Sequence, residues 1–183
     1  ALKNEAYHIR PISIKDGILT GKTHLEENFE IELDACCHLL PNENFYPYRS
    51  DLAESYCIFP YKVVNGNTSE ILFPEFCSLY PLAGQYLIRN KKTIQKLVET
   101  FIGDRWHLYT RANNIGRNFP KVYIPMTSLD TFASITFSEK HYCDNANVNF
   151  IELPVINEMN LYAMSAIINS IIFSVLARSI ANP

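Results

Sequence analysis

The feature that most constrains the fold is the C-terminal run of residues 155–180, in which every residue between Glu158 and Arg178 is uncharged. A buried strand usually has only about 4–8 residues, so a run of this length predicts a helix over about 156–180. Asn157 suits the N-cap of such a helix. Arg178 suits its last turn, where a cation opposes the negative end of the helix dipole. We therefore expect one long, very apolar C-terminal helix.

The apolar residues of this helix cover most of its circumference, which leaves its environment open. A helix that is apolar all round is either buried on most sides or lies in lipid. The uncharged window is close to the roughly 20 residues that a membrane span needs. The run also contains polar residues, Asn160, Asn169 and several serines. Such residues are tolerated at helix contacts in lipid and are also common in the core helices of soluble proteins. Three interpretations follow: a core helix, an interface between subunits, or a membrane anchor.

The length and composition predict one folded α+β domain over residues 1–183, with the 155–180 helix as its core or interface element. The chain has 183 residues, of which 48% are hydrophobic, and this is ample for a core. Residues 28–39 alternate apolar and polar side chains, which predicts one half-buried strand. Asn65-Gly66 predicts a two-residue hairpin turn between strands at 56–64 and 71–76. The sheet should therefore be mainly antiparallel.

The remaining segments complete this predicted fold. An amphipathic helix is expected at about 93–102, because its apolar residues recur with helical spacing. Pro81 and Gly84 predict an irregular segment over 77–90. Further strands are expected at 105–110 and 121–126, and a second hairpin is expected from 134–142 and 148–153. We expect the two helices to pack on one face of a single sheet.

Charge is divided unevenly along the chain. Six bases and twelve acids give residues 1–88 a net charge of −6. Eight bases and two acids give residues 89–121 a net charge of +6, and two bases and five acids give residues 122–183 a net charge of −3. A basic middle segment with acidic flanks can pair with the protein's own acidic half, with a partner protein, or with an anion.

The acidic face of the predicted 28–39 strand is a candidate metal site. Glu30, Glu32, Asp34 and His38 fall on the same side of that strand, about 7 Å apart between neighbouring positions. Carboxylate oxygens bind hard divalent cations, and histidine adds a borderline ligand. With the basic segment nearby, such a site would suit metal-assisted phosphoryl chemistry. The alternative is a polar, solvent-facing sheet surface. Apart from this divalent metal, the sequence predicts no cofactor.

The basic segment also carries aromatic residues, which makes it a candidate binding surface. Cations can neutralise phosphates while aromatic rings stack on the bases of a single strand of nucleic acid. The alternative is that the aromatic side chains belong to the core. The candidate binding residues are Arg105, Trp106, Tyr109, Arg111, Arg117 and Lys121.

The five cysteines predict reduced thiols rather than a disulfide framework, since their number is odd. With no signal peptide visible, we expect an intracellular setting, either the cytoplasm, a host cell or a viral particle. Cys36, Cys37 and His38 with His141 and Cys143 would be weak zinc ligands, because successive strand residues face opposite sides. Cys143 with His141 is a second, equally unsupported pairing for nucleophilic catalysis.

No catalytic motif stands out, so the sequence favours a non-enzymatic structural or interaction subunit of a larger protein assembly. We expect it to dock through the basic 89–121 segment and the apolar 155–180 helix, either onto other proteins or onto copies of itself. The first alternative is a nuclease-like enzyme that uses a divalent metal on phosphate-containing substrates. The second alternative is a nucleic-acid-binding module. The apolar helix also leaves membrane contact open.

Overall fold

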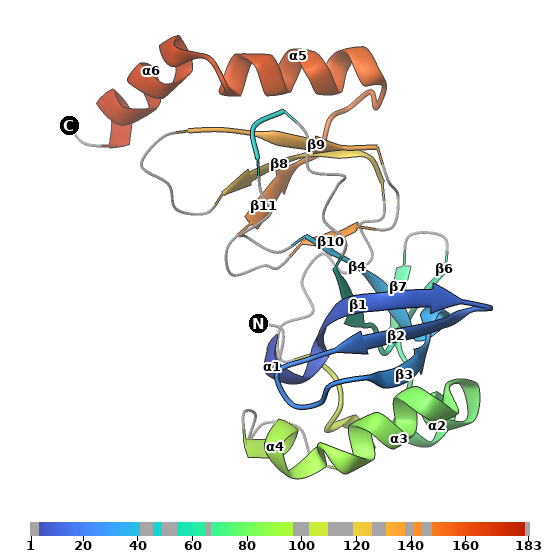
Figure 1. The fold of residues 1–183 in the computed structure, drawn as a ribbon. Helices are drawn as coiled ribbons and strands as arrows, with labels where there is room; N and C mark the ends of the chain where they lie inside the picture. Colours follow the sequence, from blue (N-terminus) through green and yellow to red (C-terminus); the bar gives the residue numbers. More distant parts are fainter. Residues whose placement is uncertain are drawn as a thin grey trace. The chain divides into compact units, whose positions relative to one another are not determined.

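A computed structural model gives the fold of this chain (Figure 1). Its described residues are 4–40, 46–48, 55–64, 67–96, 103–109, 119–125, 131–137, 141–143 and 148–181. The backbone divides into two compact units, the first from residues 1–39 and 54–117 and the second from residues 40–53 and 118–183. Helices combine with antiparallel sheets, which confirms the predicted α+β class. The single-domain assignment stays a prediction.

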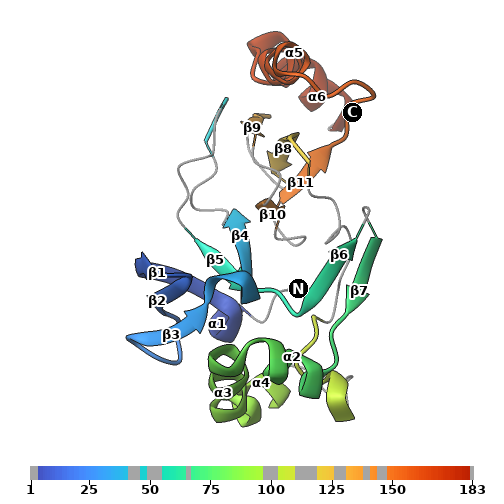
Figure 2. The same cartoon turned by 90° about the vertical axis from the view of Figure 1, so that its right-hand side faces the viewer.

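The first unit is built around an antiparallel sheet (Figure 2). A short helix, α1 (Asn4–Tyr7), precedes it. The strands are β1 (His8–Lys15), β2 (Ile18–Lys22), β3 (Phe29–Glu32), β4 (Cys36–Leu40) and β5 (Tyr56–Ile58), and they pair in the order β4-β5-β1-β2-β3. Asp16 and Gly17 close the β1–β2 hairpin with φ of 51° and 77°. Two successive positive φ angles are what a type I′ hairpin turn requires.

The predicted continuous strand at 28–39 is wrong, and its predicted inner side is buried only in part, since Leu33 and Cys37 are half-buried. Strands β3 and β4 are separated by a 3-10 turn, η1 (Leu33–Ala35). The turn lets β3 pair with β2 and β4 pair with β5, which lie at different places in the sheet. Phe29, Ile31, Ala35 and Leu39 are still buried, as the alternation predicts.

Residues 61–90 form a hairpin followed by two helices, each of which begins with a proline, Pro74 or Pro81, in its first turn. The Asn65-Gly66 hairpin is confirmed, since β6 (Tyr61–Val64) pairs with β7 (Asn67–Glu70) across a two-residue gap. However, the predicted strand at 71–76 and the irregular segment at 77–90 are wrong. Helices α2 (Phe73–Leu79) and α3 (Pro81–Arg89) occupy them, each with proline in its first turn. Proline is tolerated there because that turn has no intrahelical partner for its N–H.

Helix α3 packs against β3, and α4 (Lys91–Lys96) follows it. The α4 helix covers the start of the predicted 93–102 helix, and residues 97–102 lie outside the described part. The predicted strand at 105–110 is wrong for its described residues. The chain there forms a 3-10 turn, η3 (Gly103–Arg105), and then a bend. The four successive residues 106–109 are all buried, which a half-buried strand would not allow.

The second unit carries its own sheet, so the prediction of one sheet with both helices on one face is wrong. The strands of this sheet are β8 (Lys121–Pro125), β9 (Ser134–Thr136) and β11 (Val148–Ile151), and the short strand β10 (His141–Cys143) is not part of it. Strand β8 confirms the prediction for 121–126 and lies between β11 and β9. The predicted second hairpin is therefore not formed, because β9 and β11 both pair with β8.

Two helices replace the single long helix predicted at 156–180. They are α5 (Glu158–Ile168) and α6 (Ile171–Ala181), and their axes differ by 60°. Asn157 is the N-cap, as predicted, and its side chain accepts a hydrogen bond from Asn160 N at 2.8 Å. Figure 1 shows α5 lying across the sheet of the second unit. There Leu161 and Ile168 join the core formed by Val122, Ala133 and Ile135.

Candidate functional site

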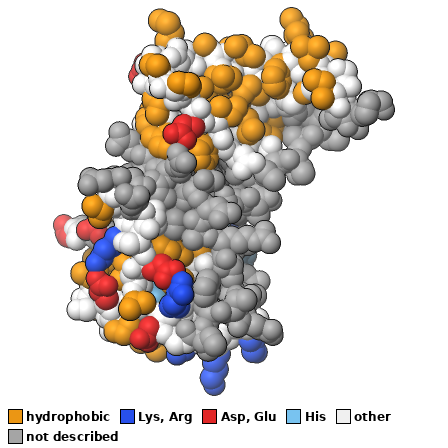
Figure 3. Space-filling view, turned by 180° about the vertical axis from the view of Figure 1, so that it is seen from behind, with side chains coloured by type: hydrophobic (Ala, Val, Ile, Leu, Met, Phe, Trp, Pro, Cys, Tyr) orange, Lys and Arg blue, Asp and Glu red, His pale blue; other side chains and the backbone are white. Residues whose placement is uncertain are grey.

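The most unusual surface of the described residues belongs to α5 and α6. Large hydrophobic side chains along residues 155–180 are between 37% and 79% exposed. We call this set the α5–α6 surface, and Figure 3 shows hydrophobic side chains gathered over this part of the molecule. Its members are Val155, Ile156, Met159, Tyr162, Ile167, Ile171, Ile172, Phe173, Val175, Leu176 and Ile180.

The helical period explains why this surface stays exposed. Leu161, Ser165 and Ile168 recur every three or four residues, so they share one side of α5, and all three are buried. Met159, Ala163 and Ala166 would then fall on the opposite side, and they are exposed. In α6 only the positions of Ser174 and Ala177 are half-buried. The sheet therefore covers one stripe of a helix pair that is apolar on nearly all sides.

Asn169 attaches the break between the two helices to the sheet. Its side-chain oxygen accepts a hydrogen bond from Ala133 N at 3.0 Å, and its Nδ2 donates to Ala133 O at 2.8 Å. The same Nδ2 also lies within hydrogen-bond distance of Ser165 O and Ser165 Oγ. The Asn169 carboxamide thus pairs with Ala133 in both directions, as a neighbouring strand would. Ser174 adds a contact between its Oγ and Thr131 Oγ1 at 2.6 Å.

An apolar groove borders this surface where the chain enters α5. It has a volume of about 370 Å³ and is lined by Leu153, Pro154, Val155, Asn160, Ala163, Met164 and Ile167. The groove and the exposed side chains form a surface without charge from residue 159 to residue 177, and Glu158 and Arg178 flank it. An uncharged apolar surface of this kind is suited to contact with other apolar surfaces.

The helices of the described part do not include one that is long and apolar enough to cross a bilayer by itself. Helices α5 and α6 satisfy such a test of length and composition only when they are taken together, across their 60° bend.

The four predicted metal ligands lie in different surroundings. Glu30 is exposed on β3, and Asp34 is exposed on η1. Glu32 accepts hydrogen bonds from the backbone N–H groups of Leu82, at 2.8 Å, and Ala83, at 3.0 Å. The His38 ring packs on Tyr56, with 4.6 Å between the ring centroids. Within the described ranges, no three acidic, histidine or cysteine side chains are grouped to hold a metal ion.

Glu32 has a structural role that the sequence did not indicate. Helix α3 begins after Tyr80, whose side chain makes no capping hydrogen bond. The carboxylate of Glu32 accepts from the first free N–H groups instead, and its negative charge opposes the positive end of the helix dipole. The strand therefore caps the helix that packs on it.

The predicted basic and aromatic residues mostly contact their own unit. Arg105 forms an ion pair with Glu70 at 2.6 Å, and Lys91 Nζ lies 5.0 Å from the centre of the buried Trp106 ring. Tyr109 is buried, and its backbone N–H donates to Tyr61 Oη. In the second unit, Lys121 is buried against the rings of Phe119, Tyr123 and Phe150. Arg111 and Arg117 lie outside the described residues.

Cys36, Cys37 and Cys57 lie on the neighbouring strands β4 and β5, and the thiols of Cys36 and Cys37 are not activated as nucleophiles. Cys37 Sγ lies 3.2 Å from Cys57 Sγ on the neighbouring strand, and Cys36 Sγ donates to Glu32 O. Burial raises the pKa of Cys36 and of Cys37 well above the usual range of a thiol, so both stay protonated at neutral pH. The side chains of His141 and Cys143 lie outside the described residues.

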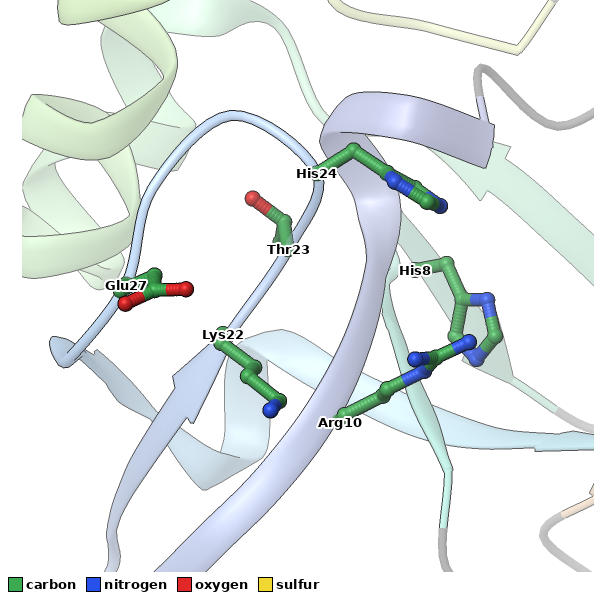
Figure 4. A pocket seen from close by; sticks show the side chains of 6 residues that line it. All are labelled: His8, Arg10, Lys22, Thr23, His24 and Glu27. Atoms are coloured by element: carbon green, nitrogen blue, oxygen red, sulfur yellow. The ribbon is translucent and has the colours of Figure 1, made fainter.

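The sequence reasoning missed a polar cavity of about 170 Å³ in the first unit. Figure 4 shows its lining side chains, His8, Arg10, Lys22, Thr23, His24 and Glu27. The available signal was the spacing of two residues between His8 and Arg10 and between Lys22 and His24. That spacing places each pair on one face of its strand or of the strand's continuation.

No family model matches this chain. A search of curated proteins also found no match.

Proposed function

We propose that this protein is a non-enzymatic interaction subunit that assembles with a second copy of itself through the α5–α6 surface. The observation that carries the proposal is the exposure of that surface. With exposed fractions between 37% and 79%, the eleven large side chains present on the order of 1,000 Å² of apolar area to solvent. The largest apolar patch on a typical monomer covers roughly 300–600 Å².

The area matches what a stable dimer buries. A standard interface removes about 800 Å² from each partner, and interfaces between identical subunits are the more apolar ones. Removing the α5–α6 surface from water is strongly favourable, because each Å² of apolar area contributes about 25 cal/mol before the costs of association. The uncharged run from residue 159 to residue 177 would desolvate no ionised group.

The absence of charge along this surface suits an identical partner. In a twofold dimer, residue i of one copy meets residue j of the other, and j meets i. The uncharged run 159–177 of one copy would then face the same run of its partner, and the exposed flanking residues Glu158 and Arg178 would lie at the rim.

The basic 89–121 segment has a smaller part in this proposal. Arg105 pairs with Glu70, and Arg89 binds Glu26 through its Nε and Nη2 atoms. Lys121 is buried among aromatic rings. These cations support the predicted pairing with the protein's own acids more than docking to a partner.

The first test is the solution mass of the full chain, measured by light scattering without detergent. We expect a particle of twice the chain mass of 21.0 kDa. The variant Val175→Lys places a charge at a position that is 61% exposed in the middle of α6, where lysine is a good helix former. Burying that charge in the interface should weaken association at least tenfold, which is about 1.4 kcal/mol.

Gln85→Lys is the matched control, because it adds the same charge to an exposed position of α3 in the other unit. It should leave the mass unchanged. A wild-type chain that stays at 21.0 kDa at high concentration would overturn the proposal. Binding to lipid vesicles by a chain that remains monomeric would also overturn it, and would assign the α5–α6 surface to a membrane.

A further inference from the structure

Two cysteines of the first unit lie directly opposite each other on neighbouring strands. Cys37 on β4 is the register partner of Cys57 on β5 (Figure 2). Two residues further along the same ladder, Leu39 N donates a hydrogen bond to Ser55 O at 2.9 Å. Because hydrogen-bonded pairs recur at every second position of an antiparallel ladder, Cys37 and Cys57 are also such a pair, with Cα atoms about 5.5 Å apart. This spacing falls within the range of about 4.4–6.8 Å that disulfides require.

The side chains of this pair point toward each other. Cys37 Sγ lies 3.2 Å from Cys57 Sγ, so a disulfide bond of about 2.05 Å requires the two sulfurs to approach by only about 1.2 Å. Tyr109 Oη donates to Cys57 Sγ at 3.6 Å, which holds this sulfur in position. Cys36 points to the other side of β4, and its Sγ donates to Glu32 O. The alternation of the strand therefore selects Cys37 rather than its neighbour.

The pair lies close to the points where the chain leaves and re-enters the first unit. This unit consists of residues 1–39 and 54–117, so the chain that connects β4 to β5 passes through residues 40–53 of the second unit. A covalent bond between residues 37 and 57 would close this connection into a loop of about 20 residues. Such a loop limits the conformations of the unfolded chain and thereby stabilises the folded one.

We propose that Cys37 and Cys57 form a disulfide when the chain folds in the presence of a small-molecule disulfide, such as oxidised glutathione. One cysteine thiolate attacks the small disulfide, which forms a mixed disulfide and releases one small thiol. The thiolate of the other cysteine then attacks the mixed disulfide and releases the second small thiol. The two cysteine protons end on the released thiols, and the two electrons reduce the small disulfide. The odd number of cysteines is compatible with one such bond, which leaves three thiols reduced.

Burial determines when this exchange can occur. Cys57 is fully buried in the folded chain, and burial raises the pKa of the Cys37 thiol well above its usual range. Because the thiolate is the reacting form, exchange is slow at neutral pH once the fold is complete and faster while the chain is still folding. The same burial protects the completed bond from external thiols. The disulfide is separate from the α5–α6 surface and does not depend on self-association.

The test is refolding of the full chain from urea in a glutathione redox buffer, followed by alkylation of the remaining thiols and tryptic peptide mapping by mass spectrometry. Trypsin places Cys36 and Cys37 in residues 23–49 and Cys57 in residues 50–62. We expect a disulfide between these two peptides as the main product. Oxidation should raise the midpoint of thermal unfolding by about 5–10 °C, and a reductant should reverse this rise.

Two variants separate the adjacent cysteines, which share one tryptic peptide. Cys37→Ser should abolish both the disulfide and the rise in the unfolding midpoint. Cys36→Ser is the matched control and should retain both. Cys57→Ala is a second test, in which the disulfide should again be lost, and circular dichroism of each reduced variant shows that it folds.

The opposite pattern would overturn the proposal. Retention of the disulfide by Cys37→Ser, or its loss in Cys36→Ser, would show that the register does not select the pair. A wild-type chain that keeps all five thiols reduced, or that forms mainly intermolecular disulfides, would also overturn the proposal.

Discussion

Both units pack helices on an antiparallel sheet, but the exposed side chains of these helices are largely charged in the first unit and largely apolar in the second. In the first unit, α3 and α4 present Arg89, Lys91, Lys92 and Lys96 to solvent. In the second unit, the outer side of α5 and most of α6 carry exposed apolar side chains. The charged helices form a surface that suits water, whereas the uncharged pair exposes far more apolar area than a monomer usually does. This difference is the reason why we propose that docking occurs through the second unit.

The units also differ in how helix and sheet are joined. In the first unit, a strand residue reaches the start of a helix, since Glu32 accepts from the N–H groups of Leu82 and Ala83. In the second unit, a residue at the end of a helix reaches the sheet, since Asn169 pairs with Ala133. Both joints satisfy backbone groups that would otherwise be unpaired, so each should contribute measurably to stability.

The largest effect is expected at the second joint. Asn169→Ala removes the partner of Ala133 N, which belongs to a buried residue, and should lower the free energy of unfolding by about 2–4 kcal/mol. Native-state hydrogen exchange provides a local readout, because the Ala133 amide should exchange much faster in the variant.

The control for this joint is Asn160→Ala, whose side chain donates only to the exposed Val155 carbonyl. It should change the free energy of unfolding by less than about 0.5 kcal/mol. If Asn169→Ala left the exchange of Ala133 unchanged, the contrast between the two joints would be lost.

A smaller effect is expected at the first joint. Glu32→Ala removes two hydrogen bonds to a carboxylate at the start of α3 and should destabilise the chain by about 1–2 kcal/mol. Glu30→Ala is the matched control, because Glu30 is exposed on the same strand. Urea unfolding of both variants measures the difference. Equal stability of the two variants would mean that Glu32 does not cap the helix. Glu32 would then again be a candidate metal ligand.

The smallest effect concerns Tyr86, which joins α3 to the start of the chain. Its hydroxyl donates to Ala6 O at 2.7 Å, and the ring stacks on Phe29 with 4.4 Å between the centroids. Tyr86→Phe keeps the ring and removes the hydroxyl, so it should cost about 1 kcal/mol at pH 7. Thermal unfolding measures this change.

The same residue predicts a dependence on pH. Burial raises the pKa of Tyr86 to about 12, whereas tyrosine in an unfolded chain ionises near pH 10. Between these values the unfolded state has lost its proton and the folded state has kept it. The contribution of the Tyr86 hydroxyl to the free energy of unfolding is therefore complete below pH 10 and decreases as the pH rises toward 12. Tyr86→Phe should reduce that loss. An identical alkaline profile for both proteins would contradict the assigned cause.

Local patterns in the sequence predicted local structure well. Asn65-Gly66 predicts a hairpin because both residues tolerate positive φ, and β6 and β7 form it. Asn157 predicts a cap because its side chain can reach a free N–H group. The alternation over 28–39 identified the buried side of the chain, yet it could not show the 3-10 turn, since pairing with different strands imposes the bend. The prediction of an irregular segment at Pro81 was wrong because proline both interrupts regular structure and is favoured in the first turn of a helix, as in α3.

The candidate sites divide in the same way. The helical and apolar character of the C-terminal region and the absence of charge from residue 159 to residue 177 could be predicted, because these properties depend on side chains that are near neighbours along the chain. Strands β8 and β9 cover one side of α5, and the Ala133 backbone binds Asn169 at the break between the helices. Neither contact could be predicted from local sequence. Likewise, only the fold shows that Glu32 binds the start of α3 whereas Glu30 stays exposed, and that Arg10 lies opposite Lys22. Sequence alone determines what a side chain can do, whereas tertiary contacts between distant segments determine which of those groups are already occupied.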